Sequence, residues 1–276
     1  MRSPYRFGVW SGAVASAVVL AAQAAAAQST PAAAAEGEAL PVIGHVQFEQ
    51  KISQTSGGFV GTLNNADALG LAVAPIGDLD GDGTADLAVG AAGDDDGGSE
   101  DLGAVWILFL HPNGTVKSHQ KISAVEGGFT GVLDDVDFFG RSVSSIGDLD
   151  GDRTADLAVS AIGDDDGGED RGAVWILLLG PNGAVRLHTK ISDTSGGFIG
   201  DLDDVDLFGF SVAALGDLDG DRNADLAVGA PGDDDGSSDR GAAWILYLDG
   251  NGCFVQTLFE DGFESGHTGA WSATVG

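Results

Sequence analysis

The chain has 276 residues, of which 43 are acidic and 12 are lysine or arginine, so its formal net charge at pH 7 is −31. Such acidity argues against nucleic acid as a partner, because the phosphates would be repelled. Hydrophobic residues make up 43% of the sequence, which is enough for a packed core and too much for an intrinsically disordered chain. A single cysteine, Cys253, excludes a disulfide within the chain.

Residues 1–27 are expected to be a signal peptide that directs the chain to the cell exterior. Arg2 and Arg6 supply the positive start, residues 8–22 are apolar and small, and three alanines at 25–27 fit an A-x-A cleavage site. The alternative is an uncleaved anchor, although the apolar run is barely long enough to span a bilayer. We therefore expect a secreted, periplasmic or cell-surface protein, in contact with a membrane only if this segment is retained.

A repeat of about 70 residues organises most of the remaining chain. It is preceded by residues 28–44, which are rich in alanine and proline and predict a flexible linker. We place the three copies at about 45–113, 114–182 and 183–251, followed by a closing strand at 252–259 and a tail at 260–276 that falls outside the repeat.

Each copy predicts four short strands, so the expected fold class is all-β. In the first copy we expect them at 46–52, 69–76, 85–90 and 104–110, where β-branched and aromatic runs are bounded by Gly, Asp and Asn. An Asn-Gly pair, a strong hairpin signal, follows the last strand of each copy and joins it to the next strand of the chain. Each sheet therefore combines three strands of one copy with the first strand of the following copy. The strand at 46–52 is left over and is expected either to pair elsewhere or to lie exposed as an edge.

An acidic loop of nine residues separates the second and third predicted strands of every copy. It places aspartates at positions 1, 3, 5 and 9, and position 7 offers a backbone carbonyl. Hard oxygen ligands at this spacing suit Ca²⁺. The alternative is an acidic turn without metal. The predicted ligands are Asp78, Asp80, Asp82, Thr84 and Asp86 in the first loop, Asp148, Asp150, Asp152, Thr154 and Asp156 in the second, and Asp217, Asp219, Asp221, Asn223 and Asp225 in the third.

Two further features recur with the same period. Triple aspartates at 94–96, 164–166 and 233–235 are interpreted as solvated turns, with a second cation site as the alternative. One tryptophan per copy is expected in the core, because buried strands are where such residues pack. These are Trp106, Trp175 and Trp244; the alternative is an exposed aromatic platform for a ligand.

The second strand, acidic loop and third strand together resemble the FG-GAP repeat of integrin alpha chains. The residues that carry the resemblance are Phe139-Gly140 and Phe208-Gly209 before the loops, with a weaker Leu69-Gly70, and the Val-Gly-Ala-Pro that ends at Pro231. The resemblance covers roughly residues 45–259. It implies a β-propeller blade per repeat, with Ca²⁺ bound in the loop between the first two strands of a blade.

The sequence departs from that pattern at Arg153 and Arg222, which replace the glycine found at Gly83. Strain is expected there if the position needs a positive φ, and a cation beside the carboxylates is expected to weaken metal affinity. Propellers typically close with four to eight blades. Three copies leave open a small ring, an open arc, or part of a wheel that self-association completes.

The expected function is that of a secreted, calcium-binding module for interaction or adhesion, with structural Ca²⁺ sites and a protein or glycan ligand outside the cell. The alternative is a lectin-like carbohydrate-binding module. An enzyme is not expected, because the histidines form no repeated set and no serine, cysteine or histidine constellation with a nucleophile motif occurs.

Overall fold

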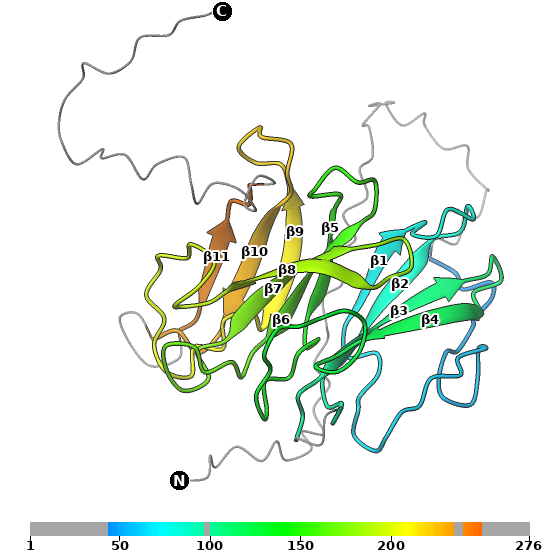
Figure 1. The fold of residues 1–276 in the computed structure, drawn as a ribbon, viewed down its shortest axis with the longest axis horizontal. Helices are drawn as coiled ribbons and strands as arrows, with labels where there is room; N and C mark the ends of the chain where they lie inside the picture. Colours follow the sequence, from blue (N-terminus) through cyan, green and yellow to red (C-terminus); the bar gives the residue numbers. More distant parts are fainter. Residues whose placement is uncertain (1–43, 97–99, 235–239, 250–276) are drawn as a thin grey trace, which may run out of the picture. The chain divides into compact units, whose positions relative to one another are not determined.

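The computed structural model describes residues 44–96, 100–234 and 240–249, and all regular structure in them is β-strand (Figure 1). The chain divides into two compact units, Met1–Gln47 and Phe48–Gly276. Of the first unit only residues 44–47 are described, and they are exposed and outside any strand. The predicted signal peptide, nearly all of the linker, the closing strand and the tail lie outside the described residues. In the described ranges no helix is long and apolar enough to cross a membrane.

The strands form three separate antiparallel sheets, each ordered as in the chain, which confirms the predicted all-β class. The first sheet holds β1 (Val73–Gly77), β2 (Asp86–Ala91), β3 (Ala104–Leu110) and β4 (Val116–Ile122); the second holds β5 (Val143–Gly147), β6 (Asp156–Ala161), β7 (Ala173–Leu179) and β8 (Val185–Ile191); the third holds β9 (Ser211–Gly216), β10 (Asp225–Ala230) and β11 (Ala242–Leu246). One sheet corresponds to each repeat.

The predicted exchange of strands between repeats is confirmed in the first two sheets. β4 pairs with β3 and β8 pairs with β7, although β4 and β8 belong to the following copy of the repeat. The Asn-Gly pair closes the first of these hairpins, with Gly114 at φ 78° and its N–H donating to the carbonyl of His111 at 2.8 Å. Glycine adopts this left-handed conformation without a steric penalty.

The predicted strand at 46–52 is wrong. These residues lie outside any strand, and the side chains of Val46 and Phe48 are largely exposed. The corresponding segments β4 and β8 form strands because each pairs with the last strand of the preceding copy. Among the described residues no strand pairs with 46–52 in this way.

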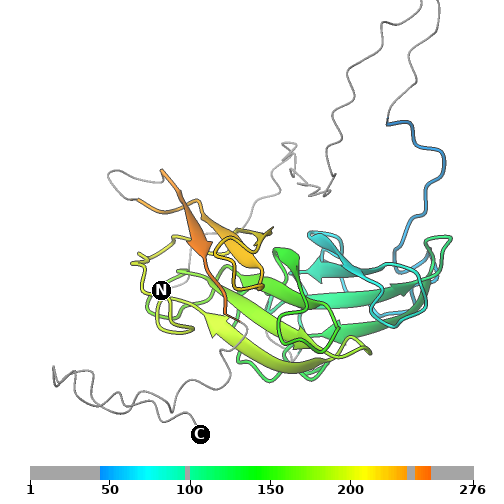
Figure 2. The ribbon, with the colours of Figure 1, turned by 90° about the horizontal axis from the view of Figure 1, so that it is seen from above.

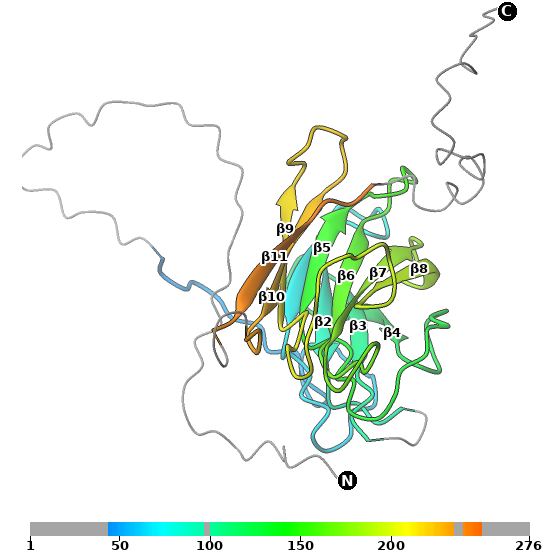
Figure 3. The same cartoon turned by 90° about the vertical axis from the view of Figure 1, so that its left-hand side faces the viewer.

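The sheets pack on one another through their first strands, since β1 contacts β5 and β5 contacts β9 (Figures 1 and 3). Two seryl oxygens strengthen the second contact: Ser142 accepts a hydrogen bond from Val212 N–H, and Ser144 accepts one from Ala214 N–H, both at 3.0 Å. One apolar core lies between the first and second sheets and another between the second and third. Among the described strands the sheets do not close into a barrel, so the arrangement corresponds to part of a propeller.

Burial follows from this stacking (Figure 2). β3 and β7 are buried along nearly their whole length, whereas β11 in the last sheet alternates between exposed and half-buried residues. Trp106 and Trp175 are buried at 3% and 4% exposure, which confirms their place in the core, and Trp244 is half-buried. The tryptophans of the first two sheets therefore form no exposed aromatic platform.

Gly103 lies where the first sheet closely approaches the segment that leads into the second. It has φ 87° and forms an isolated bridge with Phe139. A Cβ at this position would lie 2.1 Å from the carbonyl oxygen of Phe139. Since this oxygen belongs to backbone, the two sheets would have to move apart to admit a side chain.

We predict that Gly103→Ala lowers the free energy of unfolding by more than about 2 kcal/mol, because it combines backbone strain with a clash. Gly197→Ala is the matched control: Gly197 has φ 73°, but no atom lies within 4 Å of the added Cβ. It should cost only about 1 kcal/mol. Denaturant unfolding measures both, and equal losses would contradict the close approach.

Candidate metal centres

Each acidic loop connects the first two strands of its sheet and brings three of its aspartates together. One oxygen from each of positions 1, 3 and 9 lies within 4.8 Å of the others. The three groups are Asp78, Asp80 and Asp86; Asp148, Asp150 and Asp156; and Asp217, Asp219 and Asp225. The predicted ligands at position 5, which are Asp82, Asp152 and Asp221, lie outside these groups. The residues at position 7 (Thr84, Thr154 and Asn223) donate their backbone N–H to the aspartate at position 5 of the same loop.

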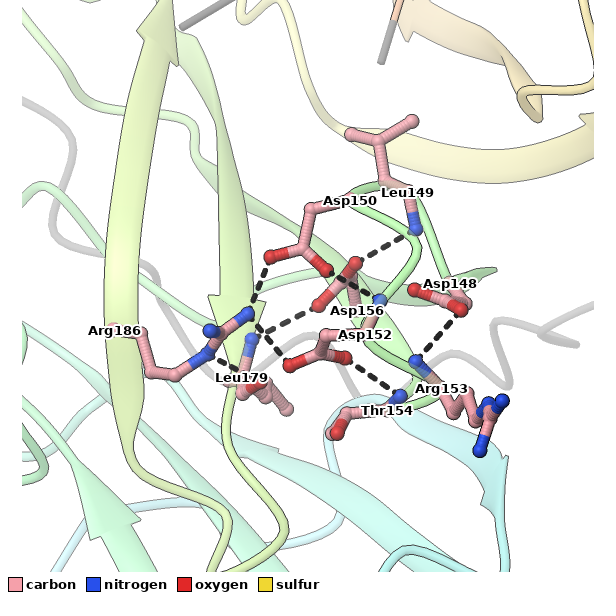
Figure 4. A network of polar contacts seen from close by, with 9 residues as sticks. All are labelled: Asp148, Leu149, Asp150, Asp152, Arg153, Thr154, Asp156, Leu179 and Arg186. Carbon is pink, nitrogen blue, oxygen red and sulfur yellow. Dashed lines mark hydrogen bonds and ion pairs between the residues drawn. The ribbon is translucent and has the colours of Figure 1, made fainter. Parts of the chain in front are cut away.

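The ninth aspartate is buried and anchors the loop to the sheet. Asp156 accepts a hydrogen bond from Leu149 N–H in the loop at 2.8 Å and another from Leu179 N–H at the end of β7 at 2.9 Å (Figure 4). Burial raises the pKa of Asp156 to about 6, although both hydrogen bonds favour the charged form. Asp86 and Asp225 are equally buried and make the corresponding pairs of bonds.

The aspartates at positions 1 and 5 of each loop hold the loop backbone in shape. In the second loop Asp148 accepts a hydrogen bond from Arg153 N–H at 2.8 Å, and Asp152 accepts one from Thr154 N–H at 2.7 Å. The same two bonds occur in the other loops. The fifth aspartate thus has a structural role that does not depend on a metal, which the spacing argument did not anticipate.

The residue at position 6 has a positive φ in all three loops: 88° at Gly83, 75° at Arg153 and 82° at Arg222. The condition for strain at the two arginines is therefore met, because a side chain disfavours this conformation. The side chain of Arg153 points away from the carboxylates (Figure 4). The expected effect of this arginine on metal affinity has no geometric support in the second loop.

Cations from another strand lie beside the carboxylates instead. Lys117, the second residue of β4, places its Nζ 2.7 Å from Asp80 and also contacts Asp82. Hydrogen bonds to these two carboxylates raise the pKa of Lys117 above its usual value. Arg186 of β8 occupies the same place over the second loop, where it pairs with Asp150 at position 3 and Asp152 at position 5 (Figure 4). Sequence reasoning missed both residues, although each lies three residues after the glycine of an Asn-Gly pair, so the position recurs in these two copies.

The donor set fits a hard cation. Every converging atom is a carboxylate oxygen, the group that Ca²⁺ prefers, and the ninth aspartate is held at a fixed position by two backbone bonds. Each of its oxygens accepts a single backbone hydrogen bond and keeps a further lone pair for a metal. The positive side chains beside the first two loops show that these carboxylates already attract a cation.

The interpretation of the triple aspartates as solvated turns is wrong for the first residue of each run. Asp94, Asp164 and Asp233 are 1%, 3% and 6% exposed. In the second sheet Lys190 of β8 places Nζ 2.5 Å from Asp164 and 2.8 Å from Asp166. Its ammonium also lies 5.5 Å from the ring centroid of Trp175. Lys121 of β4 makes the equivalent contacts in the first sheet, so the cation bound at these two runs is a lysine.

A further buried aspartate lies beside this ion pair. Asp137 is 2% exposed and accepts a hydrogen bond from Asp134 N–H at 2.9 Å. Burial raises its pKa to about 7, with the nearby charges of Asp164 and Asp134 acting in the same direction and Lys190 opposing them. Asp137 is therefore partly protonated at neutral pH.

Sheets of this order, each with an acidic loop between its first two strands, define a repeat protein built of propeller-type blades. The sequence model of the FG-GAP repeat matches residues 69–108, 139–177 and 208–246, and every match contains one acidic loop. The chain thus contains three copies of the FG-GAP repeat.

Two curated relatives are integrin alpha chains. Mouse integrin alpha-2 is 38% identical over 96 residues, which is 34% of this chain and 8% of that protein. Integrin alpha-5 of Xenopus laevis is 41% identical over 96 residues, which is 35% of this chain and 9% of that protein. The matched part therefore spans under a tenth of the length of either relative.

We predict that stability falls as the pH rises from 5 to 8, partly because of Asp137. Its pKa is about 7 in the folded chain against the ordinary 3.8 of an exposed aspartate, so the folded state binds the proton more tightly. Its contribution is complete below about pH 4 and is lost as the pH passes 7, on the order of 4 kcal/mol in all. Asp137→Asn, which keeps an oxygen acceptor, should flatten the pH dependence in denaturant unfolding. Asp135→Asn, at an exposed neighbour, should leave it unchanged.

Removing the lysine from a triple-aspartate run should destabilise the fold strongly. Lys190→Met leaves the buried Asp164 without its cation, and such a loss typically costs about 3–5 kcal/mol. Lys51→Met, which removes an exposed lysine, should change the free energy of unfolding by less than about 0.5 kcal/mol. A similar small effect of both substitutions would contradict a structural role for the ion pair.

Proposed function

We propose that this chain is a secreted calcium-binding module that mediates interaction or adhesion, with Ca²⁺ stabilising the loops that join the first two strands of each sheet. The observation that carries the proposal is the convergence of three aspartate oxygens in every repeat. The FG-GAP match and the similarity to integrin alpha chains support a protein ligand outside the cell. No catalytic role is proposed, since the acidic residues of the loops serve cation binding and backbone capping.

The expected ligands are the oxygens at positions 1, 3 and 9 of each loop, completed by those at positions 5 and 7. When bound, Ca²⁺ would supply positive charge that relieves the repulsion between the carboxylates. At one to ten times its Kd, each site would add roughly 0.4–1.4 kcal/mol to the free energy of unfolding. Three sites would supply a sizeable share of the marginal stability of a small protein.

The last sheet offers a surface for the ligand. Leu215, Ile245 and Tyr247 are 41%, 45% and 62% exposed. The equivalent residues of the first two sheets are covered by the sheet that follows. We propose that this face contacts a protein, either the external ligand or a second copy of the chain that extends the propeller.

A lectin-like function remains the second candidate. The burial of Trp106 and Trp175 removes the aromatic platform that would have favoured it in the first two sheets. A glycan array on the calcium-loaded chain tests this candidate directly. Binding of one sugar class, lost on adding EGTA, would replace the protein ligand in the proposal.

We predict that the midpoint of thermal unfolding rises across a Ca²⁺ titration and falls in EGTA. The triple variant Asp80→Asn, Asp150→Asn and Asp219→Asn should lose the response, because it neutralises one converging carboxylate in each loop. Asp135→Asn serves as the exposed control. Light scattering on the same samples gives the mass, and hence the number of chains in one assembly. An unfolding midpoint that does not move with Ca²⁺ would rule out the calcium sites.

A further inference from the structure

Two basic side chains lie over acidic loops to which they do not belong. Lys117 of β4 is 2.7 Å from Asp80 and also contacts Asp82. Arg186 of β8 makes the same two contacts with the third and fifth aspartates of the second loop (Figure 4). In these two loops the aspartate at position 3, Asp80 or Asp150, is therefore shared between the group of converging oxygens and a cationic side chain.

We infer that Lys117 and Arg186 are built-in counter-cations, which compete with a divalent cation for the first two loops and so set its affinity. This inference rests on the proposed calcium function. Close carboxylates need positive charge, and the two side chains supply it when no metal is bound. A divalent cation at the same carboxylates meets a unit positive charge a few ångströms away, and this repulsion opposes its binding.

The two counter-cations differ in how firmly they are held. Arg186 also donates from Nε to the carbonyl of Leu179 at 3.1 Å, which fixes its guanidinium against the end of β7. Lys117 ends in an ammonium on a flexible stem, and among the described residues it pairs with the loop carboxylates Asp80 and Asp82. The ammonium is therefore easier to displace, and the first loop should bind Ca²⁺ more tightly than the second.

The third loop lacks such a competitor among the described residues, since no basic side chain there pairs with Asp217, Asp219 or Asp221. At the corresponding place after this loop the sequence has Val255, which carries no charge and lies outside the described residues. The chain is thus expected to have unequal sites, with the third loop first to fill.

The test compares variants of a chain in which a single loop can bind Ca²⁺. In the background Asp150→Asn with Asp219→Asn, only the first loop keeps its full set of carboxylates. Adding Lys117→Met removes the counter-cation, and Lys117→Gln does so with a polar side chain should the first variant fail to fold. Lys117→Arg keeps the charge, and Lys51→Met removes a lysine that is exposed.

Two measurements are made on each variant: the Kd for Ca²⁺ by isothermal titration calorimetry, and the midpoint of thermal unfolding in EGTA. Without its counter-cation the first loop should bind Ca²⁺ about ten-fold more tightly, as expected for one unit charge at this range. The same variant should melt at a lower temperature in EGTA, because its carboxylates then repel one another unopposed. Lys117→Arg keeps the charge and should not tighten Ca²⁺ binding, and Lys51→Met should change the Kd by less than about two-fold.

Tighter Ca²⁺ binding together with a lower unfolding midpoint in EGTA distinguishes competition from a purely structural role of Lys117. If Lys117→Met and Lys117→Gln both bind Ca²⁺ no more tightly than the background chain, the inference is overturned. The proposed function would still stand in that case, because the chain binds Ca²⁺. If neither the background chain nor any variant binds Ca²⁺, the inference and the calcium function fail together. Arg186→Gln, in a background where only the second loop is intact, repeats the comparison and should show a similar gain in affinity.

Discussion

The buried aspartate at the ninth position of each loop is the constraint on which the arrangement of a blade depends. In the second sheet Asp156 holds Leu149 in the loop and Leu179 at the end of β7, two points that lie far apart in the chain. A buried polar group that loses its partners costs about 1–3 kcal/mol, so the loop is not free to leave this place. The first and third aspartates are thereby presented from a rigid frame, in which their repulsion has to be balanced by a cation.

Part of the large negative charge is balanced locally, by side chains from the neighbouring repeat. Lys117 and Lys121 lie on the same strand and serve two different acidic groups, the loop and the triple-aspartate run. Arg186 and Lys190 repeat the arrangement on β8. Half-buried pairs of this kind are screened less than pairs at the open surface. Adjacent repeats are therefore joined by ion pairs as well as by the hydrogen bonds of the sheet.

Features that depend on nearby residues could be predicted from the sequence. The apolar run at 104–110 forms β3 with the predicted bounds, and the loop spacing brings the first, third and ninth aspartates together. The pairing of β4 with β3 could also be predicted, from the Asn-Gly hairpin, but the side-chain contacts that this pairing creates could not. Lys117 lies 35 residues from Asp82, and only the pairing of β4 with β3 brings them into contact. The strand expected at 46–52 fails for the same reason, because strand formation reflects the neighbours of a segment as much as its own preference.

The boundary of the sequence repeat does not coincide with the boundary of a sheet. A recombination event at Asn182 would separate β7 from β8, and with them Asp164 from Lys190. The segment 123–191 instead carries one complete sheet together with the two acidic segments that pair with Arg186 and Lys190 of β8. A fragment that ends at a sheet boundary, after β4 or β8, therefore keeps its last sheet complete, whereas a fragment that ends at a repeat boundary lacks one strand. The structural unit, one complete sheet, is therefore shifted by one strand from the repeat that is visible in the sequence.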